Sequence, residues 1–136
     1  MRSCLVGVVT VVLGAGLCAC SSDPEADTAA DVCASADAFR ASLTELGDVQ
    51  VVQEGTDAVQ ETWTTVQDDW AQLAEDAGDR YAEQVDRVEA AAGAVRSTVE
   101  TTQEEATTQT LGDVAAAVDV FLQDAQALVE EVSSTC

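Results

Sequence analysis

The side chains of this sequence that could carry out chemistry are its five cysteines and 26 acidic residues, because it has no histidine and no lysine. Without these residue types there is no Ser-His-Asp or Cys-His site, no Schiff-base lysine and no histidine ligand for zinc. The acidic residues of 75–79 lack the spacing of an EF-hand loop. We therefore expect no catalysis, no cofactor and no specific metal site, which leaves loose cation association as a role for the acids.

The cysteines fall into an early group and a later pair. They are Cys4, Cys18 and Cys20, followed by Cys33 and Cys136. The early group accompanies a 13-residue apolar run, Leu5 to Leu17, that follows the positively charged Arg2. A membrane-spanning helix needs about 20 apolar residues, so this run is too short to span but typical of an export signal. We expect a signal peptide over residues 1–19.

The segment Leu17-Cys18-Ala19-Cys20 resembles the lipobox of bacterial lipoproteins. In that motif the lipoprotein signal peptidase recognises an aliphatic residue three positions before an invariant cysteine and a small residue directly before it. The resemblance implies diacylglyceryl transfer to the Cys20 thiol and cleavage between Ala19 and Cys20. Cys18 departs from the pattern, because Ala, Ser or Thr is commoner there. The alternative is an ordinary secretory signal cleaved after Ala15 or Ala19, which leaves Cys20 a free thiol.

Lipid on Cys20 would place the protein on the extracytoplasmic face of the cell membrane, since dual acylation gives stable anchoring. The next residues, 21–30, contain the only proline and no large apolar side chain. This composition predicts a flexible tether over 20–30. The remaining residues, 31–136, are expected to form one domain.

The part of the chain after Cys20 is strongly acidic. It contains 26 acidic and four basic residues, a formal charge of −22. Such a charge repels the phosphates of nucleic acid and an anionic lipid surface alike. We therefore expect no nucleic-acid partner and a membrane contact only through the lipid.

Apolar residues recur every three or four positions from Asp31 onward, as in amphipathic helices. The pattern predicts helices over about 31–46, 56–77, 79–106 and 110–133. Asp31 and Asp79 are the expected N-caps of the first and third helices, and Gly78 is expected to end the second. Thr110 and Asp113 resemble a capping box at the start of the fourth.

Four helices with short connections predict an all-α, antiparallel up-down-up-down bundle. Its expected core positions are Val32, Ala36, Phe39, Leu43 and Leu46; Val59, Trp63, Val66, Trp70, Leu73 and Ala77; Tyr81, Val85, Val88, Ala92, Val95, Val99 and Thr102; and Leu111, Val114, Val118, Phe121, Ala125, Leu128 and Val132. The cluster of valines at 49–52 is expected to pack across the end of the bundle.

Cys33 and Cys136 are the pair that remains if Cys20 is lipidated, and an oxidising compartment favours their disulfide. In a bundle with an even number of helices, the start of the first helix and the end of the last lie at the same end. A Cys33–Cys136 disulfide and a four-helix count therefore support each other. The competing interpretation is a reactive or intermolecular thiol at either position.

Trp63 and Trp70 lie seven residues apart on one helical face. Such a pair can stack on a ligand, but the phase that Trp63 and Trp70 share with the neighbouring core positions favours packing inside the bundle.

The region after the lipobox is also similar in composition to small helical lipoproteins and exported proteins of actinobacteria. The sequence favours a noncatalytic interaction or structural module, with an envelope protein or the cell wall as partner. The alternative is a small-molecule-binding or cation-binding lipoprotein. The helical spacing does not separate a monomeric bundle from an oligomer.

Overall fold

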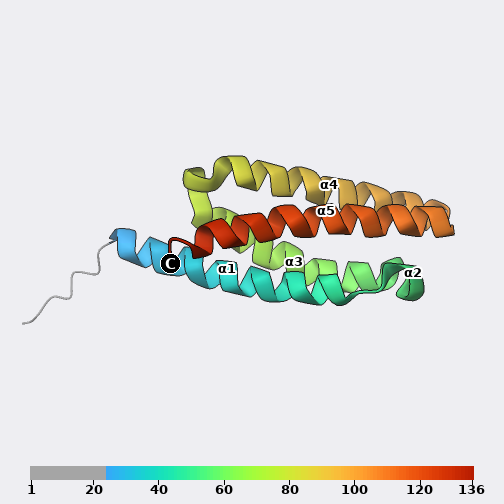
Figure 1. Cartoon of the computed structure of the whole chain (residues 1–136), viewed down its shortest axis with the longest axis horizontal. Helices are drawn as coiled ribbons and strands as arrows, with labels where there is room; N and C mark the ends of the chain where they lie inside the picture. The colour runs from blue at the N-terminus through green and yellow to red at the C-terminus, as the bar shows by residue number, and fades with distance from the viewer. Residues whose placement is uncertain (1–23) are drawn as a thin grey trace, which may run out of the picture.

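The computed structural model describes residues 24–136, which form an antiparallel four-helix bundle without strands (Figure 1). The elements are α1 (Pro24–Asp48), the single turn α2 (Val51–Glu54), α3 (Thr56–Ala77), the 3₁₀ turn η1 (Gly78–Tyr81), α4 (Ala82–Glu104) and α5 (Thr108–Ser133). The expected all-α up-down-up-down fold is confirmed. The expected signal peptide, 1–19, and residues 20–23 lie outside the described residues.

The four long helices do not pack equally tightly. Helix α1 packs closely on α3 and α5, and α4 packs closely on α5. By contrast, α3 and α4 are neighbours with few close approaches along their length, although η1 joins them directly. The bundle therefore has three tight seams and one loose seam, between α3 and α4.

The core follows the apolar repeat that the sequence shows. Of the expected core positions, only Trp70, Val85 and Leu111 are half-buried, and all the others are buried. Ala91 and Val129 join the core beside them. Because this core is built mainly from valine, alanine and leucine, the helices can approach one another closely.

Helix α1 begins at Pro24, so the expected tether over 20–30 is wrong for residues 24–30. Proline is favoured in the first turn of a helix, and acidic residues there complement the helix dipole. Residues 24–30 carry that proline, two acids and three alanines. Asp31 consequently lies inside α1 and is not its N-cap.

The reversal between α3 and α4 depends on Gly78. As expected, this glycine ends the second long helix, with a φ of 55° and a ψ of −153°. A residue with a side chain rarely adopts such a combination. The expected N-cap role of Asp79 is wrong, because Asp79 lies within η1 and α4 begins only after Tyr81.

Helix α5 begins at Thr108, two residues before the expected start. The Thr107 hydroxyl accepts a hydrogen bond from the Thr110 backbone amide at 3.1 Å, and the Thr107 amide donates to the Thr110 hydroxyl at 2.9 Å. This reciprocal pair is a capping box in which a threonine replaces the usual Glu or Gln. The predicted box between Thr110 and Asp113 is therefore wrong, because Thr110 is the second partner of the box.

The connection between α1 and α3 crosses the end of the bundle. It contains α2, where the Glu54 carboxylate accepts a hydrogen bond from the Gln50 backbone amide at 2.8 Å. Val51 is buried and Val49 packs against the core, as expected, but Val52 is 56% exposed. The residue before α3, Gly55, has a φ of 81°.

Two glycine substitutions test how the backbone conformation controls stability. A side-chain methyl would meet no atom within 4 Å at either Gly93, inside α4, or Gly78. We expect Gly93→Ala to raise the free energy of unfolding by about 0.5–1 kcal/mol, because alanine loses less backbone entropy in a helix. We expect Gly78→Ala to lower it by about 1–3 kcal/mol, because its φ is positive.

Urea unfolding of the two variants and the parent measures both effects. Shifts of the same sign would contradict the assignment of Gly78 as a backbone-determined turn.

Candidate functional site

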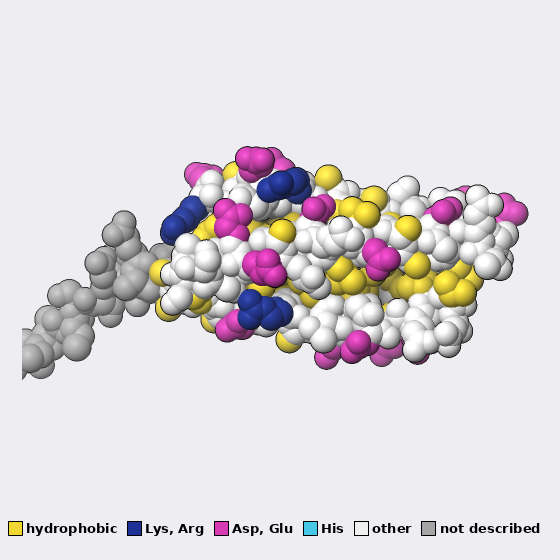
Figure 2. Space-filling view, in the orientation of Figure 1, with side chains coloured by type: hydrophobic (Ala, Val, Ile, Leu, Met, Phe, Trp, Pro, Cys, Tyr) yellow, Lys and Arg dark blue, Asp and Glu magenta, His cyan; other side chains and the backbone are white. Residues whose placement is uncertain are grey.

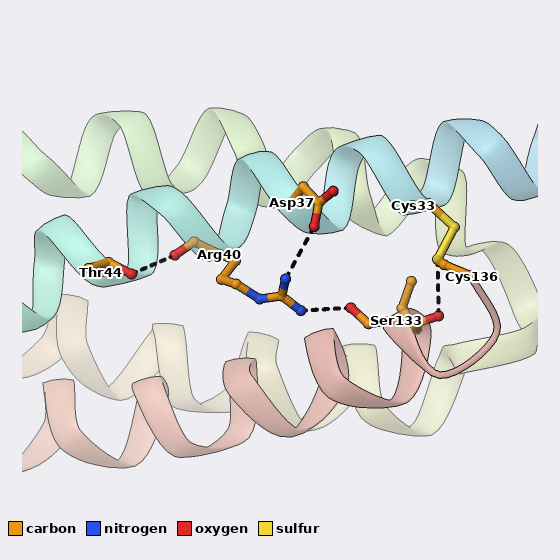
Figure 3. A network of polar contacts seen from close by, with 7 residues as sticks. Cys33, Asp37, Arg40, Thr44, Ser133 and Cys136 are labelled. Atoms are coloured by element: carbon orange, nitrogen blue, oxygen red, sulfur yellow. Dashed lines mark hydrogen bonds and ion pairs between the residues drawn. A yellow bond between two sulfur atoms is a disulfide. The ribbon is translucent and has the colours of Figure 1, made fainter.

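One end of the bundle, here called the proximal pole, holds the Cys33–Cys136 disulfide and η1. The two Cα atoms lie 6.1 Å apart although they are separated by 103 residues. Figure 3 shows the bond joining the beginning of α1 to the segment that follows α5. The predicted pairing is therefore present, and it brings both chain ends of the described bundle to one pole.

Polar contacts surround the disulfide. Arg40 of α1 lies 3.2 Å from the Asp37 carboxylate and donates a 2.7 Å hydrogen bond to the Ser133 hydroxyl of α5 (Figure 3). This is the one ion pair within residues 24–136, and such an exposed pair contributes about 0.5 kcal/mol or less. The hydrogen bond from Arg40 to Ser133, in contrast, ties α1 to the last turn of α5.

Two further hydrogen bonds tie α3 and η1 into the same pole. The buried Ser35 hydroxyl of α1 donates to the Asp76 carboxylate of α3. The Tyr81 and Thr135 hydroxyls lie 3.3 Å apart, which links η1 to the end of the chain. The proximal pole is thus cross-linked between all parts of the chain that reach it.

The predicted lipidation and cleavage residues, Cys20 and Ala19, lie outside the described residues. The first turns of α1 extend beyond the other helices at the proximal pole (Figure 1). Pro24 follows Cys20 by four residues, and four residues span at most about 14 Å. Any anchor on Cys20 is therefore close to the proximal pole.

Four of the five aromatic side chains form one cluster across three helices. Phe121 of α5 packs against Trp63 of α3, with ring centroids 4.9 Å apart, and against Phe39 of α1 at 6.4 Å. Phe39 in turn packs against Trp70 of α3 at 5.5 Å. The expected core role of the two tryptophans is confirmed, with Trp63 buried and Trp70 half-buried.

The loose seam between α3 and α4 opens into a groove of about 300 Å³, here called the α3–α4 groove. Its apolar lining is Val59, Trp63, Val95 and Val99. On its polar side, the Gln67 amide oxygen, in the orientation that satisfies its neighbours, accepts from Trp63 Nε1 at 3.0 Å and from Arg96 Nε at 3.3 Å. The groove thus reaches Trp63, whereas Trp70 packs instead on Phe39.

The basic residues are distributed unevenly along the bundle. The four basic residues that follow Cys20 are Arg40, Arg80, Arg87 and Arg96. The other end, here called the distal pole, contains α2 and the 105–107 connection. Residues 41–66 and 97–125, which build the distal part, contain eleven acidic residues and no basic one. Figure 2 accordingly shows basic side chains only over the proximal half of the visible face.

The acidic residues of the described helices do not converge into a metal site. Among residues 24–136, no three Asp, Glu or Cys side chains are grouped so that they could hold a metal ion.

None of the described helices is both long enough and apolar enough to cross a membrane.

Compared with models of known protein families, with curated proteins and with solved structures, the chain matches none of them.

Two features of the candidate site were not predicted from the sequence. The α3–α4 groove depends on how far these two helices separate, and helical periodicity contains no information about that distance. The charge segregation, in contrast, is present in the sequence, because no basic residue occurs in 41–66 or 97–125. It becomes visible only when the hairpins place these two ranges at one pole.

The disulfide leads to a test of stability and thiol content. We expect no free thiol at Cys33 or Cys136 when the non-reduced protein is alkylated and weighed. We expect the double variant Cys33→Ser/Cys136→Ser to lose about 2–5 kcal/mol of unfolding free energy, because a bridge closing about 100 residues restricts the unfolded chain strongly.

Urea unfolding of the parent with and without reductant provides the control, since the reduced parent should match the double variant. Two alkylated thiols in the parent, or unchanged stability of the variant, would contradict the bridge.

Proposed function

We propose that the protein is a bacterial lipoprotein, anchored through Cys20 to the extracytoplasmic face of the cell membrane, whose acidic bundle is a noncatalytic interaction module. The observation that carries this proposal is the separation of the two poles. The segment that resembles a lipobox precedes α1 by only a few residues, and α1 begins at the proximal pole. The distal pole then faces away from the membrane.

The disulfide supports this placement. A Cys33–Cys136 bond suits an oxidising extracytoplasmic compartment and is uncommon in a reducing cytosol. The charge supports it too, because an acidic bundle is repelled by anionic lipid headgroups and stands off the membrane. Lipid at the proximal pole and repulsion elsewhere together orient the long axis of the bundle away from the surface.

The interaction role is supported by the surface and not by any catalytic grouping. The chain has neither histidine nor lysine, and its acids are spread over helix surfaces. The distal pole has an acidic exterior and a groove with an apolar lining. Such a surface suits a basic envelope protein, whose attraction would weaken with rising salt.

Membrane attachment is tested with two neighbouring cysteine variants of the full chain. In a bacterial host that lipidates exported proteins, we expect the parent to fractionate with membranes and its first mature residue to be a diacylated Cys20. Cys20→Ser should abolish the lipid mass and the membrane retention. Cys18→Ser is the matched control and should keep both, because serine is common at that lipobox position.

Retention of Cys20→Ser equal to that of the parent would contradict the anchor. Pull-down from an envelope extract with the lipidated protein tests the interaction role. We expect a basic protein that is released as the salt concentration rises.

A second candidate function, binding of a small apolar molecule, is favoured by the α3–α4 groove. Its volume of about 300 Å³ reaches the lower end of the usual range for ligand pockets. It combines an apolar lining with the Gln67 and Arg96 polar groups, the usual composition of such pockets.

The neutral dye N-phenylnaphthylamine tests this candidate. If the groove takes apolar molecules, the dye should quench tryptophan emission, because Trp63 lines the groove. Gln60→Phe, which places a ring in the groove, should weaken the quenching about fivefold or more. Gln109→Phe, at an exposed position on α5 outside the groove lining, is the control. Equal quenching in both variants would contradict a ligand site there.

A further inference from the structure

A second groove lies at the distal pole, between the end of α1, the α2 turn and α5. This groove, here called the distal groove, has a volume of about 250 Å³. Its apolar lining consists of Leu46, Val49, Val51, Val52, Ala115, Val118 and Leu122. Figure 2 shows apolar side chains exposed along the seam between the upper and lower helices toward the distal end.

The lining combines a fixed floor with an exposed wall. Leu46, Val51 and Val118 are buried in the core, so the floor is held by the packing of the bundle. Val52, on the wall, is 56% exposed. Within the described residues only Val120 is a comparably exposed large apolar side chain, and it does not line the groove. Val52 is thus an apolar contact surface at the groove.

The surroundings of the distal groove are acidic. Asp119 lines the groove, and Asp48 and Glu54 flank its apolar residues in α1 and α2; all three are exposed. No basic residue occurs in the ranges that build this end of the bundle. A cationic surface would therefore be attracted to the groove, and an acidic or phosphate-bearing surface would be repelled.

These observations select the kind of occupant. The structure has no sheet edge within residues 24–136, so a partner cannot add a strand and must bind through side chains. The groove is smaller than most pockets that enclose a whole small molecule, but it can take apolar side chains. A helix presents such side chains on one face while its own backbone groups remain hydrogen-bonded.

A second copy of this chain is a poor occupant for the same electrostatic reason. Pairing through the distal pole would bring eleven acidic residues of each copy together without any basic residue in those ranges. Like charges at an interface oppose association.

We propose that the distal groove docks an amphipathic helix of a partner protein, with apolar residues on one face and basic residues beside them. The proposal rests on the interaction role proposed above and names its surface and its partner chemistry. The apolar face of the helix contacts Val52 and Leu122, and its basic residues face Asp48, Glu54 and Asp119. Anchoring at the proximal pole leaves this surface accessible from outside.

The test measures binding of a synthetic leucine and lysine helix to the detergent-solubilised full chain. The probe is about 18 residues long, or about five turns, with leucine at helical spacing on one face. A peptide of the same composition in scrambled order and a leucine and glutamate helix are the controls. We expect the first peptide to bind, the scrambled one to bind at least about fivefold more weakly, and the acidic one not to bind.

Two pairs of variants locate the site. Val52→Gln should weaken binding about fivefold to tenfold, because an apolar contact is lost, whereas Val120→Gln, at the similarly exposed valine outside the groove, should change it less than about twofold. Asp119→Asn should weaken binding about twofold to fivefold at low salt. Asp86→Asn makes the same charge change near the proximal pole and should have a smaller effect.

Equal effects within either pair would overturn the proposal, because binding would then be nonspecific attraction to an acidic protein. Sedimentation showing a dimer of the parent that Val52→Gln dissociates would also overturn it, in favour of a second copy in the groove. Circular dichroism confirms that each variant is folded. If the peptide does not bind but the protein is lipidated and retains an envelope partner, only the proposal for the groove is rejected. If the protein neither attaches to membranes nor retains a partner, the proposed function is rejected.

Discussion

The Cys33–Cys136 bridge is the constraint on which the arrangement of the bundle depends. It joins the first helix to the end of the chain across 103 residues, so neither terminal helix can separate from the bundle without stretching the whole domain. This restriction is important in a chain whose part after Cys20 has a formal charge of −22, because like charges favour expansion. In an alternating bundle the bridge also requires an even number of helices, because only then do both chain ends lie at one pole.

The aromatic cluster is the second contribution to stability, and it acts on only part of the bundle. Phe39, Trp63, Trp70 and Phe121 bring α1, α3 and α5 together through contacts between ring centroids at 4.9–6.4 Å. Helix α4 contributes no aromatic ring to this cluster and approaches α3 with small side chains such as Ala92 and Val95. Because the bulky Trp63 ring of α3 faces Val95 and Val99 of α4 across the groove, it holds these two helices farther apart, which gives a physical reason for the loose seam.

The helix faces could be predicted from the sequence, but several helix ends could not. The buried face of each helix is determined by a long apolar repeat, and many residues of that repeat indicate the same face. Ends depend on a few competing caps of similar energy. At Thr107 and Thr110 two threonines satisfy each other, and a prediction that expects an acidic partner chooses Asp113 instead. At Pro24 the composition typical of a tether also suits a first helical turn. The disulfide was predictable because helix number and cysteine position restrict each other.

The charges of the bundle affect how an anchored protein would stand on a membrane. Lipid at the proximal pole would place Arg40, Arg80 and Arg87 nearer the membrane, whereas Arg96 lies beyond the middle of α4. Acidic residues outnumber basic ones in both halves, so anionic headgroups repel the bundle as a whole, and the covalent anchor alone would determine which pole faces the membrane. That repulsion fades beyond a Debye length of about 10 Å, whereas a covalent anchor would persist. A partner approaching from outside would then meet the acidic distal pole first, and the apolar residues at that pole would determine whether attraction becomes specific binding.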